Sequence, residues 1–478
     1  MTLNTALVHS FPELVLALGA ISLLMLGVFR AGKGDWIISE LAIVVIGFAM
    51  LSILVPYQGR VILWDGAFVD DAFARFMKML ALGGAAFSLL LSREYMARHR
   101  IDAFEFPVLI LLSTLGMCML ISANNLIGLY LGLELMSLAL YVLAAFHRDN
   151  VRASEAGLKY FALGALSSGM LLYGASLLYG FTGTVSFQGI AAATMGNPTL
   201  GVIFGLVFVM AGLAFKMSLA PFHMWTPDVY EGAPTPITAY FASAAKVAAV
   251  AVTVRIAMTA FPGIKLQWQQ IIVFISILSM VIGAFGAIGQ LNIKRLMAYS
   301  SIGHMGFAMV ALAAGTEAGV TGVLVYLSVY LVMTLGTFAL ILSMRVGNQY
   351  VENIGDLAGL ARNDGLAAFA MAMMMLSLAG IPPLAGFFAK YYAFLAAVEA
   401  GLAWLAVIGV LASAISCFYY LRVVKIIYFD EPAPAFERPA WEVRGVIWVA
   451  LIAIVAGAAF GGPLLTAATA AARSLVRF

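Results

Sequence analysis

The fold is decided by one stretch, Ala214–Lys246, with the sequence AFKMSLAPFHMWTPDVYEGAPTPITAYFASAAK. Pro221 has no N–H group and its ring crowds the carbonyl of Met217, so a helix entering this stretch breaks there. Inside a membrane, a broken helix is tolerated only where protein or a water-filled cavity satisfies the freed backbone groups. Lys216 lies beside the break, and a lysine at mid-bilayer costs about 2.5–3.5 kcal/mol. Two lysines in one such stretch favour a functional site over a simple kink.

The composition is that of a polytopic membrane protein. Of the 478 residues, 63% are hydrophobic and 10% are charged, whereas soluble domains carry about 25% charged residues. The net charge of +3, without a basic block interleaved with aromatic residues, does not indicate nucleic-acid binding. Cys118 and Cys417 stand alone in apolar runs, and no glycine-rich phosphate motif is present, which argues against iron–sulfur, zinc and nucleotide sites. We therefore expect no cofactor and no metal in this chain, and expect energy to come from a partner chain or an ion gradient.

The apolar runs predict an all-α polytopic membrane protein. About twenty apolar residues cross a bilayer, and this length predicts about fourteen transmembrane helices, two of them broken. The predicted spans lie near 11–29, 36–56, 72–91, 104–122, 125–146, 156–180, 200–230 (broken), 236–260, 268–289, 295–314, 319–344, 365–398 (broken), 402–428 and 441–460.

The basic residues predict the orientation. If the N-terminus lies outside the cytoplasm, fifteen basic residues face the cytoplasm, namely Arg30, Lys33, Arg93, Arg98, Arg100, Arg148, Arg152, Lys294, Arg295, Arg345, Arg362, Arg422, Lys425, Arg438 and Arg444. At most six lie toward the other side, namely Arg60, Arg75, Lys78, Lys265, Arg473 and Arg477. Basic residues accumulate on the cytoplasmic side of membrane proteins. We therefore expect both termini on the non-cytoplasmic side.

The two helix breaks predict an internal repeat. Five spans within 104–260 include the break at Pro221, and five spans within 261–428 include a break at Pro382–Pro383, in SLAGIPPLAGFFAKYYAF. In both sets the break falls in the fourth span. Because five is odd, the second copy enters the membrane from the opposite side, as in the inverted repeats of transporters. The predicted parts are an N-terminal three-helix segment (1–103), two five-helix repeats (104–260 and 261–428) and a C-terminal helix (429–478).

Ionisable side chains are predicted at the middle of the membrane. Glu134, in GLYLGLELMSLALYVL, lies ten residues beyond Asn124, which is about 15 Å along a helix and close to mid-bilayer. Its own helix has no basic residue near enough to neutralise it, so we expect Lys216 to be its partner. Lys246 and Lys390 are predicted at similar depth. The four side chains would then form one buried layer.

Such a layer is suited to proton transfer. Burial disfavours the charged form of an ionisable group, and a neighbouring opposite charge favours it. Opening and closing a contact between Glu134 and Lys216 would therefore change the proton affinity of the lysine and pass a proton toward Lys246 and Lys390. A static buried ion pair is the alternative, but it would not explain the further lysines.

Three further residues are secondary candidates. Lys159 could relay protons or simply extend its ammonium group to the membrane surface. His223 and His304 could carry protons at physiological pH, or could be hydrogen-bonded residues without a role in transfer. Asp228 and Glu231 are expected to anchor the loop after the broken helix.

These motifs resemble the antiporter-like membrane subunits of respiratory complex I, a family shared with multi-subunit sodium/proton antiporters. The resemblance spans roughly 104–428 and rests on LGLELMSLALYVL, KYFALGALSSGMLLYG, FKMSLAPFHMWTPDVYEGAPTP, QLNIKRLMAYSSIGHMGF and LAGIPPLAGFFAK. It implies that the proton-relay glutamate and lysines of the family correspond to Glu134, Lys216, Lys246 and Lys390. The second half shows no acid equivalent to Glu134.

The resemblance implies a proton-translocating subunit of NADH:quinone oxidoreductase in a bacterial cytoplasmic (inner) membrane. FMN, iron–sulfur clusters and quinone would lie on partner subunits, which would include further antiporter-like subunits. A sodium/proton antiporter subunit is a second hypothesis, which carboxylates lining a sodium site would favour, whereas the predicted layer is rich in lysine. A scaffold that only transmits conformational change is a third, but a scaffold would avoid charges at mid-membrane.

Overall fold

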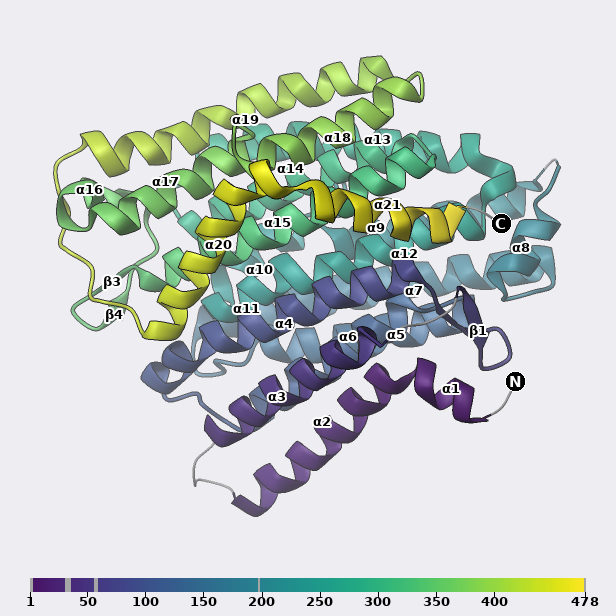
Figure 1. The fold of residues 1–478 in the computed structure, drawn as a ribbon, viewed down its shortest axis with the longest axis horizontal. Helices are drawn as coiled ribbons and strands as arrows, with labels where there is room; N and C mark the ends of the chain where they lie inside the picture. The colour runs from purple at the N-terminus through teal and green to yellow at the C-terminus, as the bar shows by residue number, and fades with distance from the viewer. Residues whose placement is uncertain (1–2, 31–35, 56–58, 197, 477–478) are drawn as a thin grey trace.

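The computed structural model describes residues 3–30, 36–55, 59–196 and 198–476. Lys33 and Arg477, two of the basic residues counted for the orientation, lie outside these ranges. Long helices run side by side along the long axis of the molecule (Figure 1). Within the described ranges the sheets are two short two-stranded hairpins. The predicted all-α class is therefore confirmed.

The elements have the following bounds. In the first half the helices are α1 Leu3–His9, α2 Phe11–Arg30, α3 Trp36–Ile53, α4 Ala72–His99, α5 Glu105–Ile121, α6 Leu126–Ala144, α7 Val151–Thr182, α8 Phe187–Ala193, α9 Leu200–Met217, α10 Trp225–Gly232, α11 Thr235–Tyr240, the π-helix η1 Phe241–Ala245 and α12 Lys246–Thr259. In the second half they are the 3-10 turn η2 Pro262–Ile264, α13 Lys265–Ile288, α14 Ile293–Ala313, α15 Glu317–Ser343, the 3-10 turn η3 Ile354–Leu357, α16 Leu360–Asn363, α17 Gly365–Ala379, α18 Ala385–Glu399, α19 Ala403–Phe429, α20 Trp441–Phe460 and α21 Gly462–Val476. The hairpins pair β1 Val61–Leu63 with β2 Phe68–Asp70 and β3 Arg345–Val346 with β4 Gln349–Tyr350.

The two ends of the bundle differ. Helix α1, strand β1 and the end of α21 lie at one end, which we call the termini end, and β3 and β4 lie at the opposite end (Figure 1). Eleven described helices are long and apolar enough to cross a membrane, or twelve if α20 and α21, which meet at 86°, form one bent span. Helices α5 and α17 are shorter, with 17 and 15 residues. Each predicted span overlaps a helix, but the total of about fourteen spans stays a prediction.

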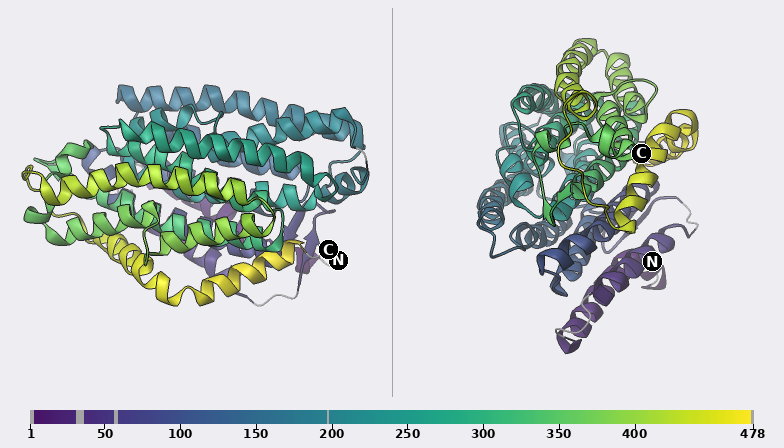
Figure 2. Two further views of the ribbon diagram at one scale, coloured as in Figure 1. Left: turned by 90° about the horizontal axis from the view of Figure 1, so that it is seen from above. Right: turned by 90° about the vertical axis from the view of Figure 1, so that its left-hand side faces the viewer.

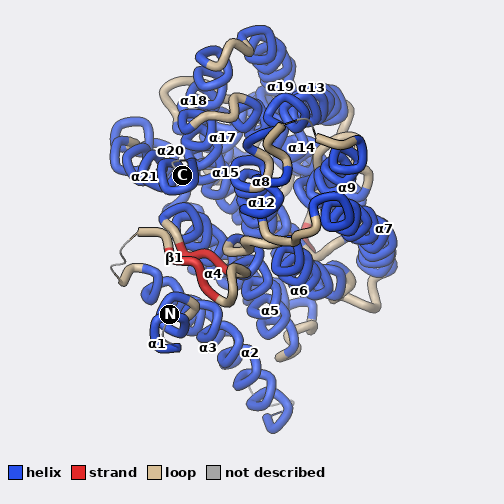
Figure 3. The backbone as a smooth tube through the Cα atoms, turned by 90° about the vertical axis from the view of Figure 1, so that its right-hand side faces the viewer, coloured by secondary structure: helices blue, strands red, loops and turns tan. Residues whose placement is uncertain are grey.

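The innermost helices come from both halves of the chain. The apolar window of α11–α12 is 100% buried, whereas that of α2 is 33% buried. Figure 3 shows α12 and α15 near the middle of the bundle, with α7, α13 and α19 toward its outside. Helices α2 and α3 lie at the edge, where exposed apolar side chains are expected to contact lipid. The core of the bundle therefore places Lys246, the first residue of α12, far from the membrane lipid.

Two helices are interrupted at the positions where the prolines in the sequence predict a break. Helix α9 ends before Ser218, whose φ is 64° and whose N–H donates to the carbonyls at the end of that helix. Helix α17 ends in the same way before Gly380, with a φ of 86°. A left-handed residue at this position satisfies the last carbonyls of a helix. The predicted breaks at Pro221 and Pro382–Pro383 are thus confirmed, and α10 and α18 are their second segments.

Glycines bring two pairs of helices into close contact. A Cβ atom on Gly116 of α5 would stand 2.4 Å from the backbone nitrogen of Met136 on α6. A Cβ atom on Gly283 of α13 would stand 2.5 Å from the backbone nitrogen of Gly303 on α14. Small residues are how membrane helices approach closely. In each predicted five-helix repeat, the first two helices therefore pack closely because a glycine lies at their contact.

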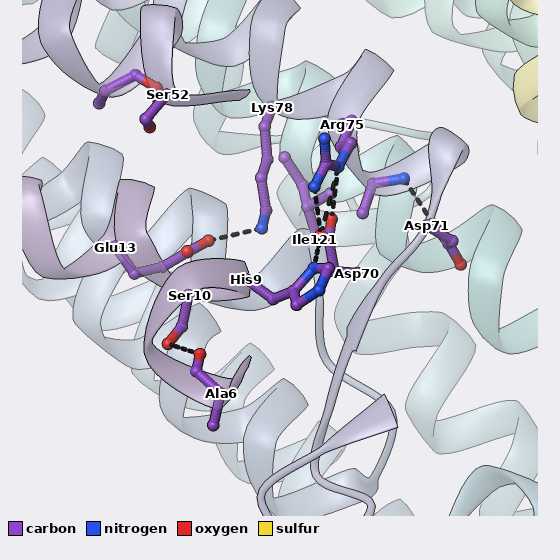
Figure 4. A network of polar contacts seen from close by, with 12 residues as sticks. Ala6, His9, Ser10, Glu13, Ser52, Asp70, Asp71, Arg75, Lys78 and Ile121 are labelled. Carbon is purple, nitrogen blue, oxygen red and sulfur yellow. Dashed lines mark hydrogen bonds and ion pairs between the residues drawn. The ribbon is translucent and has the colours of Figure 1, made fainter. Parts of the chain in front are cut away.

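Ion pairs join the N-terminal helices to the bundle at the termini end. Figure 4 shows the carboxylate of Glu13, on α2, pointing toward the ammonium group of Lys78, on α4, at 2.6 Å. Asp71 caps the start of α4 and pairs with Arg255 of α12 at 2.8 Å, with both side chains fully buried. Because a buried charge is costly when it is left alone, these pairs fix α2 and α12 against α4.

A third acid at this end lies in strand β2. Burial acts to raise the pKa of Asp70, but hydrogen bonds from Arg75 and His9 and the charge of Lys78 hold that pKa below its ordinary value. The Arg75 and His9 nitrogens lie 2.7 Å from the same carboxylate oxygen (Figure 4). Asp70 therefore stays ionised and ties the hairpin β1–β2 to α1 and α4.

Candidate functional site

Lys216 stands in the last turn of α9, directly before the helix break. Its side chain is 5% exposed, and its Nζ donates to the hydroxyl of Tyr141 on α6 over 2.8 Å. The ammonium group also lies 5.1 Å from the centre of the Tyr141 ring. Trp225 donates its indole N–H to the carbonyl of Phe215 over 3.0 Å, so the interrupted helix end does not depend on Lys216 for a partner. The lysine is thus left to interact with the neighbouring helix.

Glu134 lies on α6, two turns before Tyr141. Its side chain is half-buried between the exposed Leu131 and Leu138, and its Oε1 atom has no hydrogen-bond partner among the described residues. The direct contact predicted between Glu134 and Lys216 is not formed: the two interact only as separated charges, and the lysine contacts Tyr141 instead. Sequence spacing places both at similar depth but does not fix the side of α6 from which the carboxylate projects.

Lys246 begins α12, and the π-helix η1 immediately precedes it. Its side chain is 1% exposed and donates to the hydroxyl of Ser301 on α14. Ser301 in turn shares a hydrogen bond of 2.6 Å with the hydroxyl of Tyr330 on α15. The ammonium group lies 5.6 Å from the centre of the Tyr230 ring. π-helical turns occur frequently at functional sites, and this one sets the direction in which Lys246 projects.

His304, on α14, is near enough to both Lys246 and Lys390 to interact with their charges. Its Nδ1 is 2.7 Å from the hydroxyl of Tyr326, and its Nε2 is 3.1 Å from the hydroxyl of Tyr420. Both ring nitrogens therefore have a hydroxyl partner. A neutral imidazole donates at one nitrogen and accepts at the other, so it can take up a proton at one nitrogen and release one at the other.

Lys390 stands in the second segment of the second broken helix and is 6% exposed. Its Nζ donates to the carbonyls of Ala379 and Leu378, at 2.8 and 3.1 Å, and to the hydroxyl of Ser413 at 2.7 Å. The first two acceptors are at the end of α17, where a cation is favourable because the carbonyls there carry partial negative charge. Within the described chain these three acceptors are neutral.

The structure separates Lys159 from the buried lysines. Its side chain is 42% exposed and pairs with Glu155 at 2.7 Å and with Asp228 at 2.8 Å. Asp228 also pairs with Arg295 of α14 at 2.8 Å, and Glu231 pairs with Arg295 at 3.0 Å. Asp228 and Glu231, which were expected to anchor the loop after the broken helix, lie within α10 and join it to α7 and α14 through these pairs. Of the two interpretations of Lys159, the geometry favours the one at the membrane surface.

His223 lies in the loop between α9 and α10 and is half-buried. Its Nδ1 atom has no hydrogen-bond partner among the described residues. Within the described ranges it makes no hydrogen bond to a buried lysine, and it lacks the two hydroxyl partners that His304 has. Its assignment as a proton carrier stays a prediction.

Hydroxyl groups complete the site, and the sequence interpretation overlooked them. Tyr141, Ser301, Tyr330, Tyr420 and Ser413 each contact one of the predicted ionisable residues directly or through one further hydroxyl. Tyrosines buried in a membrane helix need a hydrogen-bond partner. A tyrosine in a predicted inner span is therefore the signal that could have found them.

Comparison with known proteins shows the family of this chain. Residues 123–416 match the family described as NADH:quinone oxidoreductase/Mrp antiporter, transmembrane. A curated protein from Beijerinckia indica, named NADH-quinone oxidoreductase subunit N, is 64% identical over 473 residues, covering 99% of both chains. The chain belongs to the NADH:quinone oxidoreductase/Mrp antiporter family. The resemblance found in the sequence motifs is thus confirmed.

One further curated relative and two solved structures are also similar to this chain. A subunit N from Parvibaculum lavamentivorans is 58% identical, over 98% of this chain and 97% of that protein. A chain of respiratory complex I from Thermus thermophilus is 34% identical, with a TM-score of 0.83, over 96% of this chain and 99% of that one. A chain of the Mrp complex from Dietzia sp. is 23% identical over 98% of both chains, with a TM-score of 0.87, and shows the shared fold.

Proposed function

We propose that this chain is subunit N of a proton-translocating NADH:quinone oxidoreductase. The sequence segments PDVYEGAPTP and GIPPLAGFFAK resemble that subunit most among the antiporter-like subunits. The observation that carries the proposal is the set of three buried lysines, one at each helix break and one at the centre, each hydrogen-bonded to a hydroxyl. A buried lysine at mid-membrane is rare without a functional role.

The proposed relay begins at Glu134 and Lys216. The carboxylate acts on the ammonium group as a separated charge, so its approach or withdrawal changes the affinity of Lys216 for its proton. Two unit charges 4 Å apart interact by about 4 kcal/mol at an effective dielectric constant of 20. Moving one proton against 100 mV costs about 2.3 kcal/mol. A movement of this pair is therefore large enough in energy to drive one proton.

The proposed relay continues through the centre to the second break. In this relay, Lys246 in its neutral form accepts the proton that Lys216 releases, and water molecules would carry the proton between them. Ser301 and Tyr330 adjoin Lys246, and His304, which has a hydroxyl at each ring nitrogen, is the proposed carrier from there to Lys390. Lys390 is the last carrier. Water and the hydroxyls would pass the proton between these groups without any covalent step in this chain.

We propose the same division into parts as the sequence indicates. Two inverted five-helix repeats, 104–260 and 261–428, follow a three-helix segment, 1–103, and precede the C-terminal part, 429–478. The matching breaks and the glycine-packed helix pairs support this division. The C-terminal part contains two helices, α20 and α21.

FMN, iron–sulfur clusters and quinone would be held by partner subunits in a bacterial cytoplasmic membrane. Partners would include further antiporter-like subunits and the lipid bilayer. A subunit of a sodium/proton antiporter is the second candidate, because the Dietzia Mrp chain shares the fold. The acceptors around the three lysines are hydroxyls and backbone carbonyls instead of carboxylates, which favours the first candidate.

The proposal is tested by gentle purification of the tagged chain. We expect other membrane subunits and a hydrophilic part carrying FMN and iron–sulfur clusters to co-purify, and we expect the preparation to oxidise NADH with quinone. When the preparation is reconstituted in liposomes, NADH oxidation should change the pH of the lumen in a medium that contains no sodium. A preparation that contains only antiporter subunits and exchanges sodium for protons would support the second candidate instead.

The proposed orientation gives a second prediction. A cysteine replacing Gly355, an exposed residue of the turn η3, should react with an impermeant thiol reagent only from the cytoplasm. A cysteine replacing Gln188, at the termini end, should react only from outside. Cys118 is buried, and Cys417 is changed to serine in both variants. Labelling from the opposite sides would reverse the orientation inferred from the basic residues.

A further inference from the structure

A buried pair of a glutamate and a lysine lies outside the relay. Glu13, in the first turn of α2, points toward Lys78, in the second turn of α4, at 2.6 Å (Figure 4). The exposed fractions of the two side chains are 9% and 2%. The buried thiol of Cys118, on α5, is near enough to interact with both charges. Helices α2 and α4 carry none of the relay residues, and Figure 2 shows α2 at the edge of the bundle.

The neighbouring buried pair, Asp71 with Arg255, is built to stay charged. The Asp71 carboxylate accepts hydrogen bonds from both terminal nitrogens of Arg255 and from the backbone N–H of Ala74. An arginine keeps its proton in proteins. Hydrogen bonds and a permanent cation both stabilise the charged form of a carboxyl group.

Glu13 lacks both of these features. Apart from the contact with Lys78, neither of its carboxylate oxygens has a hydrogen-bond partner among the described residues. Its cation is a lysine, and a buried lysine gives up its proton more readily than an arginine does. Burial disfavours the charged form of both groups. A neutral pair, with a carboxylic acid beside an amine, is therefore accessible at Glu13 and not at Asp71.

Ionisable groups connect this pair to the surface at the termini end. The charge of Lys78 acts on Asp70, whose carboxylate lies 2.7 Å from nitrogens of Arg75 and His9 (Figure 4). The exposed fraction of the side chain rises from 3% at Asp70 to 14% at His9. An imidazole can bind and release protons near neutral pH. His9, four residues before Glu13, is therefore suited to carry protons between this surface and the pair.

We propose that Glu13 and Lys78 form a proton-exchange site that faces the non-cytoplasmic side. A proton moves from Nζ of Lys78 to a carboxylate oxygen of Glu13: one N–H bond breaks, its electron pair stays on the nitrogen, and one O–H bond forms. The acid then exchanges this proton with water beside His9, and a proton returns by the reverse steps. The exchange rests on the buried contact, whereas the side of the membrane rests on the proposed orientation.

The site is connected to the relay through α4. A Cβ atom on Gly84, farther along α4, would stand 3.0 Å from the Cβ atom of Ala244 in η1, so the two helices touch there. Ala244 lies two residues before Lys246. A change of charge at the pair therefore acts on a helix that contacts the turn before Lys246. If the proposed function holds, the relay thereby responds to the proton concentration on the side toward which it pumps.

The first test treats the whole complex with an apolar carbodiimide, which reacts with protonated carboxyl groups. We expect label on Glu13 and none on Asp71, located by mass spectrometry of the peptides. Lys78→Arg keeps a cation that does not release its proton, so it should remove most of the label on Glu13. Lys78→Met removes the cation, so it should increase the label and shows that the reagent reaches the site. Equal label in the unaltered chain and in Lys78→Arg, or label in Lys78→Met alone, would overturn the proposal.

The second test determines the side from which the proton comes. The complex is placed in sealed vesicles, and the side from which Gln188→Cys reacts defines the termini end. Lowering the pH on that side alone should increase the label on Glu13, and lowering it on the other side alone should not. Label that follows the pH of the other side would contradict the proposal. Neither measurement needs quinone reduction, so a failure of the proposed function would appear separately, as the absence of that activity.

Discussion

A chain in which Lys390 is replaced with methionine is expected to lose proton pumping together with NADH-driven quinone reduction. Lys216→Met should cause a loss of the same size, although it lies in the other half of the chain. Methionine keeps the length of the side chain and removes the titratable group, so no carrier remains at that step. We expect a decrease of about tenfold or more, since positioned proton-transfer groups contribute about 10²–10⁴-fold.

The control for Lys390→Met is Lys265→Met. Lys265 donates to the carbonyl of Ala314 over 2.8 Å, just as Lys390 donates to that of Ala379 over 2.8 Å. Both lysines therefore satisfy a carbonyl near the end of a helix, but Lys265 stands at the termini end, outside the relay. Equal losses from the two substitutions, at matched assembly, would show that the capping bond is what matters.

The double variant Lys216→Met with Lys390→Met distinguishes one relay from two. In a serial relay, one missing link already stops transfer, so the double variant should be little worse than the worse single one. Independent sites would give multiplied losses, because distant sites without shared function contribute additive free energies. Pumping and quinone reduction are measured in all variants at equal amounts of assembled complex.

Arg255→Met is expected to cause the largest loss of stability in the chain. Arg255 donates to both carboxylate oxygens of Asp71, at 2.8 and 2.9 Å, and to the carbonyl of Ile121 at 3.0 Å. Its removal leaves a fully buried carboxylate without its hydrogen-bonded cation, and breaking a buried pair in this way costs about 3–5 kcal/mol. Thermal inactivation of the purified complex and the amount that assembles both report this loss.

The control for the buried pair is an exposed one. Arg473 pairs with Glu317 at 2.7 Å, with side chains that are 56% and 28% exposed, and such surface pairs contribute about 0–1 kcal/mol. Arg473→Met should therefore change the inactivation temperature little. Adding Asp71→Asn to Arg255→Met should recover part of the stability, because asparagine can still cap α4 without a buried charge. If Arg255→Met is as stable as Arg473→Met, the buried pair does not hold α4 and α12 together.

The sequence predicted the features that rest on rare local signals. A proline or a lysine in an apolar run is conspicuous because it is costly there, so both breaks and all three buried lysines could be located by position alone. The bend between α20 and α21 has a comparable signal in Gly461, Gly462 and Pro463, which the predicted single C-terminal helix did not take into account.

The contacts between helices could not be predicted in the same way. Depth follows from counting residues along one helix, but contact depends on which faces meet, and many faces of an apolar helix are chemically alike. Hence Glu134 and Lys216 were placed at similar depth, whereas Tyr141 as the partner of Lys216 was not foreseen. The two tyrosines that contact His304 were not foreseen either, because Tyr326 lies on α15 and Tyr420 on α19, two helices that are far apart in the sequence.

The π-helical turn before Lys246 has a mechanical consequence. Its five residues contain one residue more than the same turn would need as α-helix. Ser243, within this turn, donates its hydroxyl to the carbonyl of Ala239 in the preceding helix α11 over 2.6 Å. If that surplus residue moves along the helix past Lys246, the lysine rotates by about 100° around the axis, since an α-helix has 3.6 residues per turn. The ammonium group could then leave Ser301 and face another helix while both ends of the span stay in place. The surplus residue would act as a pivot built into the backbone.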